Sequence, residues 1–202
     1  MTLIKPFAAV AATLAIWACA EPGSASAAPL RSGLYEGMIL AVSPGGRVTG
    51  HVDITQGEGV TKRCAFDFVG QRAGDGATIH TVGASGLTGR LSAGTADEVA
   101  LSMARVRGLP GCGLVLPPEA ETANGAELDR IRPGGWTELA KISGARVVLH
   151  AEPGGPAGRA YLVKGDVVGV LARRSGHVQV VYPSERSRWT QGWVAATDLA
   201  PF

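Results

Sequence analysis

Apolar and polar side chains alternate along many short segments of the chain after residue 30. In residues 48–55, the apolar Val48, Val52 and Ile54 alternate with polar side chains such as His51 and Asp53. A period of two residues predicts a strand with one buried face. Comparable segments predict about seven strands, over residues 34–42, 48–55, 64–70, 77–83, 86–93, 98–106 and 112–117. Their spacing of about 10–15 residues favours a small antiparallel β-barrel or sandwich over residues 30–118.

Residues 119–135 break the alternation. This segment is polar and contains several Pro and Gly residues, which predicts an irregular linker with one short helical turn near Ala126–Arg130. Alternation returns in residues 136–202, which we interpret as a second domain. Its expected strands are Val147–His150, Val167–Arg174, His177–Tyr182 and Thr190–Ala195, followed by a short 3₁₀ turn at Thr197–Leu199. The predicted fold class is therefore all-β throughout.

Gly165 and Asp166 stand immediately before the apolar run that begins at Val167. A Gly-Asp pair suits either a loop that binds a ligand or a turn that leads into a strand. We interpret it as a turn, in which Gly165 takes a turn conformation and the Asp166 side chain caps it. This interpretation gives Asp166 a structural role and not a catalytic one.

Three motifs in the second half occur in a recognisable order. They are Leu-x-x-Gly-Asp at 162–166, Ser-Gly at 175–176 and Gly-Trp-Val at 192–194. With this spacing, residues 140–200 resemble the bacterial SH3-like (SH3b) family. The resemblance implies a C-terminal five-stranded SH3-like barrel, a long first loop over residues 151–166, and binding of cell-wall peptidoglycan or an envelope protein.

The sequence departs from that family at His177, where the family often has a Trp that forms one wall of a peptide groove. Trp189, beside Arg188, could supply a different aromatic and basic surface, or it could pack against the barrel. The candidate ligand-binding residues of this half are therefore Tyr161, Arg173, His177, Arg188 and Trp189.

The first 27 residues have the composition of a secretory signal peptide. Lys5 precedes an apolar run over residues 7–20, and Ala25-Ser26-Ala27 is suited to cleavage by a signal peptidase. We therefore expect a secreted or periplasmic protein of the bacterial cell envelope. Cys19 loosely resembles a lipid-attachment site, but the bulky Trp17 argues against a lipid anchor there. No later segment is long and apolar enough to predict a transmembrane helix.

Cleavage of the signal peptide would leave two cysteines, Cys64 and Cys112. In an oxidising compartment these two residues are expected to form a disulfide. It would close a loop of about 50 residues and contribute about 3–4 kcal/mol by the chain-entropy estimate.

No constellation of catalytic or metal-binding residues is recognisable. The four histidines lack His-x-x-x-His spacing, no Cys-x-x-Cys pair occurs, and Gly-x-Ser-x-Gly is absent. Cys64 lies in an alternating strand pattern and lacks the helix start that activates a catalytic thiol. We therefore expect no enzymatic activity, no cofactor and no metal.

The charge balance excludes an ordinary nucleic-acid-binding protein. The chain has 19 Lys and Arg against 17 Asp and Glu, and no dense basic run. The leading hypothesis is a non-catalytic envelope protein that binds peptidoglycan or an envelope protein partner. The alternative is an inhibitor or immunity module directed at a secreted lytic enzyme.

Overall fold

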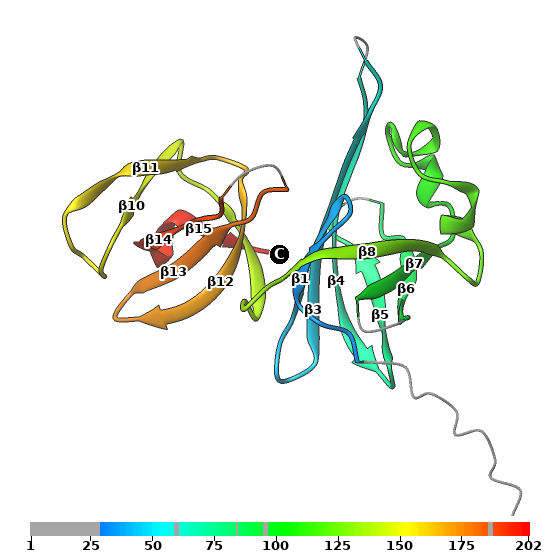
Figure 1. Ribbon diagram of the computed structural model, residues 1–202, viewed down its shortest axis with the longest axis horizontal. Helices are drawn as coiled ribbons and strands as arrows, with labels where there is room; N and C mark the ends of the chain where they lie inside the picture. The colour runs from blue at the N-terminus through cyan, green and yellow to red at the C-terminus, as the bar shows by residue number, and fades with distance from the viewer. Residues whose placement is uncertain (1–28, 59–60, 84, 95–96, 186–187) are drawn as a thin grey trace, which may run out of the picture.

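The computed structural model is all-β and describes residues 29–58, 61–83, 85–94, 97–185 and 188–202. Its strands form a closed antiparallel barrel and a second, seven-stranded sheet, which lie side by side (Figure 1). The predicted signal peptide, residues 1–27, and Cys19 lie outside the described residues. Among the residues that are described, no helix is long and apolar enough to span a membrane.

Eight strands form the barrel, each paired with the next along the chain, and the last pairs with the first. They are β1 (Gly33–Tyr35), β2 (Met38–Val42), β3 (Arg47–Gln56), β4 (Lys62–Ala73), β5 (Gly76–Thr81), β6 (Thr88–Ala93), β7 (Glu98–Met103) and β8 (Ala126–Pro133). The inward residues pack into one core that includes the fully buried Phe68, Ile79 and Leu91. The predicted all-β fold is therefore confirmed. Of the two expected arrangements, barrel or sandwich, this part forms a closed barrel, and its interior is filled by apolar side chains.

The expected linker at 119–135 is wrong, because this segment contains β8. Strand β8 pairs with β7 on one side and β1 on the other, and so closes the barrel. The predicted helical turn at Ala126–Arg130 is part of this strand. Only Ala126 and Leu128 of β8 are buried, so its apolar alternation is too short to stand out among the charged residues around it.

Two other barrel segments also differ from expectation. Residues 112–117, expected to be a strand, begin with the 3₁₀ helix η2 (Cys112–Leu114). It lies between η1 (Val106–Gly108) and η3 (Pro118–Glu121). Residues 34–42, expected to be one strand, are divided into β1 and β2 by a turn at Gly37, whose φ of +66° favours glycine.

The second sheet contains seven strands in the order β11-β10-β14-β13-β12-β9-β15. They are β9 (Glu138–Ile142), β10 (Arg146–His150), β11 (Ala157–Val163), β12 (Val167–Arg174), β13 (His177–Tyr182), β14 (Thr190–Ala195) and β15 (Leu199–Pro201), with η4 (Ala196–Asp198) before β15. The expected strands β10, β12, β13 and β14 are all present, but they belong to a seven-stranded sheet where the resemblance implied a five-stranded barrel. The expected loop at 151–166 instead contains β11, whose side chains are nearly all exposed and therefore show no apolar period.

Asp166 caps the turn between β11 and β12, as predicted. Its carboxylate Oδ2 accepts a hydrogen bond of 2.8 Å from the backbone N–H of Val163. Gly165, in the same turn, has a φ of +95°. Asp166 therefore links the edge strand β11 to the buried strand β12.

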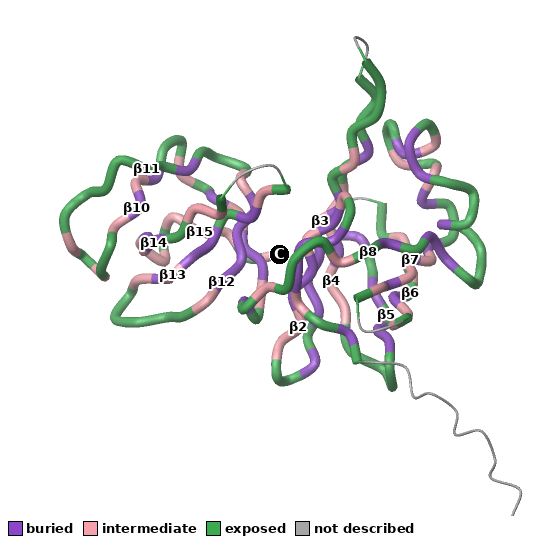
Figure 2. Tube along the Cα trace, in the orientation of Figure 1, coloured by how far each residue is buried: buried purple, intermediate pink, exposed green. Residues whose placement is uncertain are grey.

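A third apolar cluster joins the barrel to the second sheet. Trp136 is at its centre and is 1% exposed. The cluster also contains Ala41 of the barrel and Leu139, Val167 and Val181 of the second sheet. Figure 2 shows buried residues at this boundary as well as inside each part.

Hydrogen bonds fix the geometry of this junction. Trp136 Nε1 donates to the carbonyl oxygen of Leu40 at 2.8 Å, and Leu139 N donates to Thr49 Oγ1 at 3.0 Å. Gly169 on β12 leaves room for the indole, since a Cβ there would lie 2.6 Å from the Trp136 ring. The two parts are therefore held together by a packed and hydrogen-bonded interface.

Cys64 on β4 and Cys112 on η2 form the predicted disulfide. Because it closes a long loop, replacing both cysteines by Ala is expected to lower the free energy of unfolding by about 2–5 kcal/mol. Urea denaturation followed by circular dichroism measures the difference. A loss below about 1 kcal/mol would show that the loop is held without the bond.

Trp136→Ala is expected to lower the free energy of unfolding by about 3–5 kcal/mol, because it empties the centre of the junction. Trp193, which is only half-buried, provides the matched control. Trp193→Ala should cost clearly less in the same urea titration. Equal losses for the two variants would contradict the central role of Trp136.

Candidate functional site

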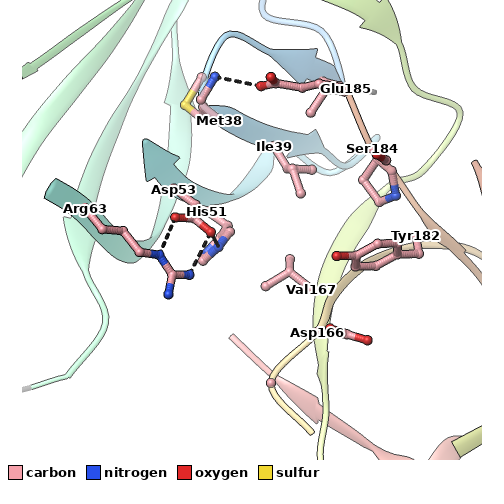
Figure 3. Close-up of a pocket in the computed structure, with 14 residues that line it drawn as sticks. Met38, Ile39, His51, Asp53, Arg63, Asp166, Val167, Tyr182, Ser184 and Glu185 are labelled. Atoms are coloured by element: carbon pink, nitrogen blue, oxygen red, sulfur yellow. Dashed lines mark hydrogen bonds and ion pairs between the residues drawn. The ribbon is translucent and has the colours of Figure 1, made fainter. Parts of the chain in front are cut away.

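A cleft of about 290 Å³ lies between the barrel and the second sheet. Its walls come from the β1–β2 turn and strands β3 and β4 on one side, and from the β11–β12 turn and the end of β13 on the other. The lining residues are Leu34, Gly37, Met38, Ile39, His51, Asp53, Arg63, Gly165, Asp166, Val167, Tyr182, Pro183, Ser184 and Glu185. Figure 3 shows these two walls facing each other. The cleft brings together titratable side chains that are distant in the sequence.

The barrel wall carries a bidentate ion pair between Asp53 and Arg63. Arg63 Nε lies 2.6 Å from Asp53 Oδ1 and its Nη2 lies 2.7 Å from Oδ2. The two residues are on paired strands, where Asp53 opposes Ala65. The Asp53 carboxylate raises the pKa of the Arg63 guanidinium, first by hydrogen bonding and then by its charge. Because Arg63 is largely exposed, the pair contributes little to stability.

Asp67 connects the two parts of the molecule behind this wall. Its Oδ1 accepts a hydrogen bond of 2.8 Å from His51 Nδ1, and its Oδ2 forms an ion pair with Lys141 Nζ on β9. Burial raises the pKa of the Asp67 carboxyl, but the hydrogen bonds and charges of His51 and Lys141 outweigh it, so the net shift is downward. An ionised carboxylate only accepts hydrogen bonds, so the proton of His51 is on Nδ1.

The opposite wall of the cleft is formed by Asp166, Tyr182 and Glu185. The Tyr182 hydroxyl points into the cleft toward the barrel wall (Figure 3). Burial raises the pKa of Tyr182, and the negative charges of Asp166 and Asp53 raise it further. At the entrance, Glu185 Oε1 accepts a hydrogen bond of 3.3 Å from Gly37 N, which connects the two walls.

His51 and Asp67 form a hydrogen-bonded pair of the kind also found in acid–base sites. Among the described residues, no hydroxyl or thiol hydrogen-bonds His51 Nε2, which lies 4.0 Å from Asp53 Oδ2. Nor does any group of three or more His, Cys, Asp or Glu in that part of the chain have the geometry of a metal site. This arrangement can orient and bind a polar ligand through fixed hydrogen-bonding groups.

The five ligand-binding residues expected from the sequence are not gathered in this cleft. Arg173 forms an ion pair with Glu138 in a separate hollow at the junction. His177 borders another hollow, with Glu152 and Pro153. Tyr161 lies on the edge strand β11, with its ring 3.8 Å from the Arg146 guanidinium carbon.

Arg188 is exposed, whereas the neighbouring Trp189 packs into the junction. The Trp189 ring lies 5.2 Å from that of Trp136, and the Arg132 guanidinium lies 4.8 Å from its centroid. Trp189 Nε1 donates to the Ser184 carbonyl at 3.3 Å. Of the two interpretations left open for Trp189, packing is the one that these contacts support.

Sequence reasoning missed the cleft residues His51, Asp53 and Tyr182. Each stands at an ordinary strand position, and only the register of β3 with β4 places His51 opposite Asp67. Asp166 was recognised, but only as the cap of its turn. The signal that could have been noticed is the concentration of charged side chains, together with His51, at residues 51–67.

Comparisons with known protein families, with curated proteins and with solved structures found no match for this chain.

Asp67→Asn is expected to lower the free energy of unfolding at neutral pH by about 1–3 kcal/mol, because charged hydrogen bonds to His51 and Lys141 are lost. The pKa of Asp67 is lower in the folded state than its ordinary value of 3.8. Its contribution is therefore complete above that value and disappears as the pH falls through the folded pKa.

Urea denaturation of both proteins at several pH values between about 2 and 7 measures this effect. The difference between wild type and Asp67→Asn should be constant near neutrality and shrink in acid. A difference that persists unchanged at the lowest pH would show that the ionised carboxylate is not its source.

Proposed function

We propose that this chain is a secreted or periplasmic, non-catalytic protein of the bacterial cell envelope that binds peptidoglycan in the cleft between its two β parts. The observation that carries the proposal is the cleft itself, which has polar groups fixed on both walls. Preformed concave sites with a few convergent polar groups are the usual form of ligand sites. The proposal requires no cofactor.

Three features of the sequence support a location in the cell envelope and the cell wall as the ligand. Residues 1–27 have the composition of a signal peptide. Residues 140–200 resemble the SH3b family, and we propose that they act as an SH3b-like domain. Residues 136–202 also carry eight Lys and Arg against five Asp and Glu, which favours attraction to anionic wall polymers at low salt.

The junction supports binding by both parts together. The cleft walls are held by Trp136, by the Asp67–Lys141 ion pair and by the Glu185–Gly37 contact. A site held in this way loses little conformational entropy when it binds its ligand. The proposed binding surface is therefore the cleft, and not the dispersed set of Tyr161, Arg173, His177, Arg188 and Trp189.

The test is sedimentation of the purified mature protein with purified, protein-free sacculi at low salt. Wild type should be retained. Ser184→Trp places an indole in the cleft and should reduce retention about tenfold or more, as expected when a ligand group is displaced from its pocket. Ser92→Trp, at a half-exposed position on β6, is the matched control and should bind like wild type.

Three outcomes would contradict parts of this proposal. Equal retention of Ser184→Trp and wild type would exclude the cleft. Retention on crude envelopes but not on purified sacculi would identify a protein partner in place of the wall polymer. Release of soluble muropeptides during incubation, measured by chromatography, would contradict a non-catalytic role.

A further inference from the structure

The charged groups that line the cleft are mostly acidic. Asp53, Asp166 and Glu185 supply three carboxylates, and Arg63 supplies the one guanidinium among the lining residues. Arg63 is already bound by both oxygens of Asp53. The barrel wall is thus close to neutral, and the excess negative charge belongs to the wall formed by the second sheet.

Asp166 retains binding capacity after it has capped its turn. Its Oδ2 accepts the hydrogen bond from Val163 N, and its carboxylate forms no ion pair with any cation of the described residues. The side chain is half-buried at the cleft wall. A partly desolvated carboxylate without a cation interacts more strongly with an incoming positive charge than an exposed one does.

Tyr182 lines the cleft, and its hydroxyl faces the barrel wall (Figure 3). Both Asp166 and Asp53, from opposite walls, raise the pKa of its hydroxyl in addition to the effect of burial. The phenol therefore stays protonated and its oxygen lies in a negative field. Within the described part of the chain this hydroxyl forms no hydrogen bond, so its oxygen is available to accept one from a ligand.

The rest of the lining is suited to an aliphatic stem. Ile39 on the barrel and Val167 on the second sheet lie between the polar groups (Figure 3). The volume of about 290 Å³ accommodates one extended side chain and not a folded partner. Long aliphatic amines bury their methylene groups on such surfaces and place the charged end among acceptors.

Resting on the proposed function, we propose that this cleft recognises a primary ammonium group at the end of an aliphatic side chain, as carried by the diamino acid of a peptidoglycan stem peptide. The ammonium group has three donors and no acceptor. The Asp166 carboxylate and the Tyr182 oxygen receive two of them, and the methylene stem lies against Ile39 and Val167.

The first experiment titrates two peptides into the mature protein by calorimetry: N-acetyl-Gly-Lys-Gly-amide, and the same peptide with Nε-acetyl-lysine. The free ammonium peptide should bind and its acetylated form should bind at least about fivefold more weakly, as expected for loss of one partly exposed ion pair. Equal affinity of the two peptides would overturn the proposal.

Variants assign the recognition to the cleft. Asp166→Asn keeps an oxygen to accept from Val163 N but removes the charge, and should weaken the lysine peptide about fivefold. Tyr182→Phe keeps the ring and should weaken it about threefold or more. Asp75→Asn, in the exposed β4–β5 turn, and Tyr161→Phe are the matched controls and should leave the affinity unchanged.

A second experiment separates this inference from the proposed function. Sacculi are treated with acetic anhydride, which removes the positive charge of their free amines, and are compared with untreated sacculi in the sedimentation assay. Loss of binding to the acetylated sacculi supports the inference. Equal binding to both overturns the inference and leaves peptidoglycan binding intact, whereas binding to neither overturns the proposed function itself.

Discussion

The burial of Trp136 between two β structures is the interaction on which the rest of the molecule depends. The indole fills the space between β2 of the barrel and β12 of the second sheet, and its N–H bonds the Leu40 carbonyl. A large aromatic ring buried with its polar atom paired gives both packing and direction. Together with the Asp67–Lys141 ion pair and the Glu185–Gly37 contact, this burial holds the two walls of the cleft in place.

The junction combines an apolar centre with charged groups at its edges. Among the described residues, no fully buried side-chain nitrogen or oxygen lacks a partner. The Asp67–Lys141 pair is at an edge, where partial exposure lowers the cost of desolvating both charges. Asp67 and Lys141 therefore help to fix the two parts relative to each other, whereas the charges of the cleft come from Asp53, Arg63, Asp166 and Glu185.

The sequence predicted the strands whose buried faces are long, and failed where few side chains are buried. Strands β12, β13 and β14 have the predicted bounds because each contains an apolar run or an alternation whose apolar side chains are buried. Strands β8 and β11 were missed because few of their side chains are buried. Backbone hydrogen bonds pair these strands with their neighbours, and exposed or charged side chains leave no apolar period in the sequence. The cleft could not be predicted, because it depends on how two sheets meet, and the period of one strand carries no information about that.

The charge distribution explains how one protein could attract an anionic polymer and still select a cation on it. Residues 136–202, which form the second sheet, are net basic, whereas the charged groups of the cleft beside it are mostly acidic. Long-range attraction depends on net charge and is screened by salt, but recognition in a partly buried site depends on the few groups in contact. Under the proposed function, the basic surface increases the rate at which the protein encounters the wall. The cleft then determines which group of the polymer the protein binds. A polymer that carries both carboxylates and free ammonium groups satisfies both requirements, and a purely anionic one satisfies only the first.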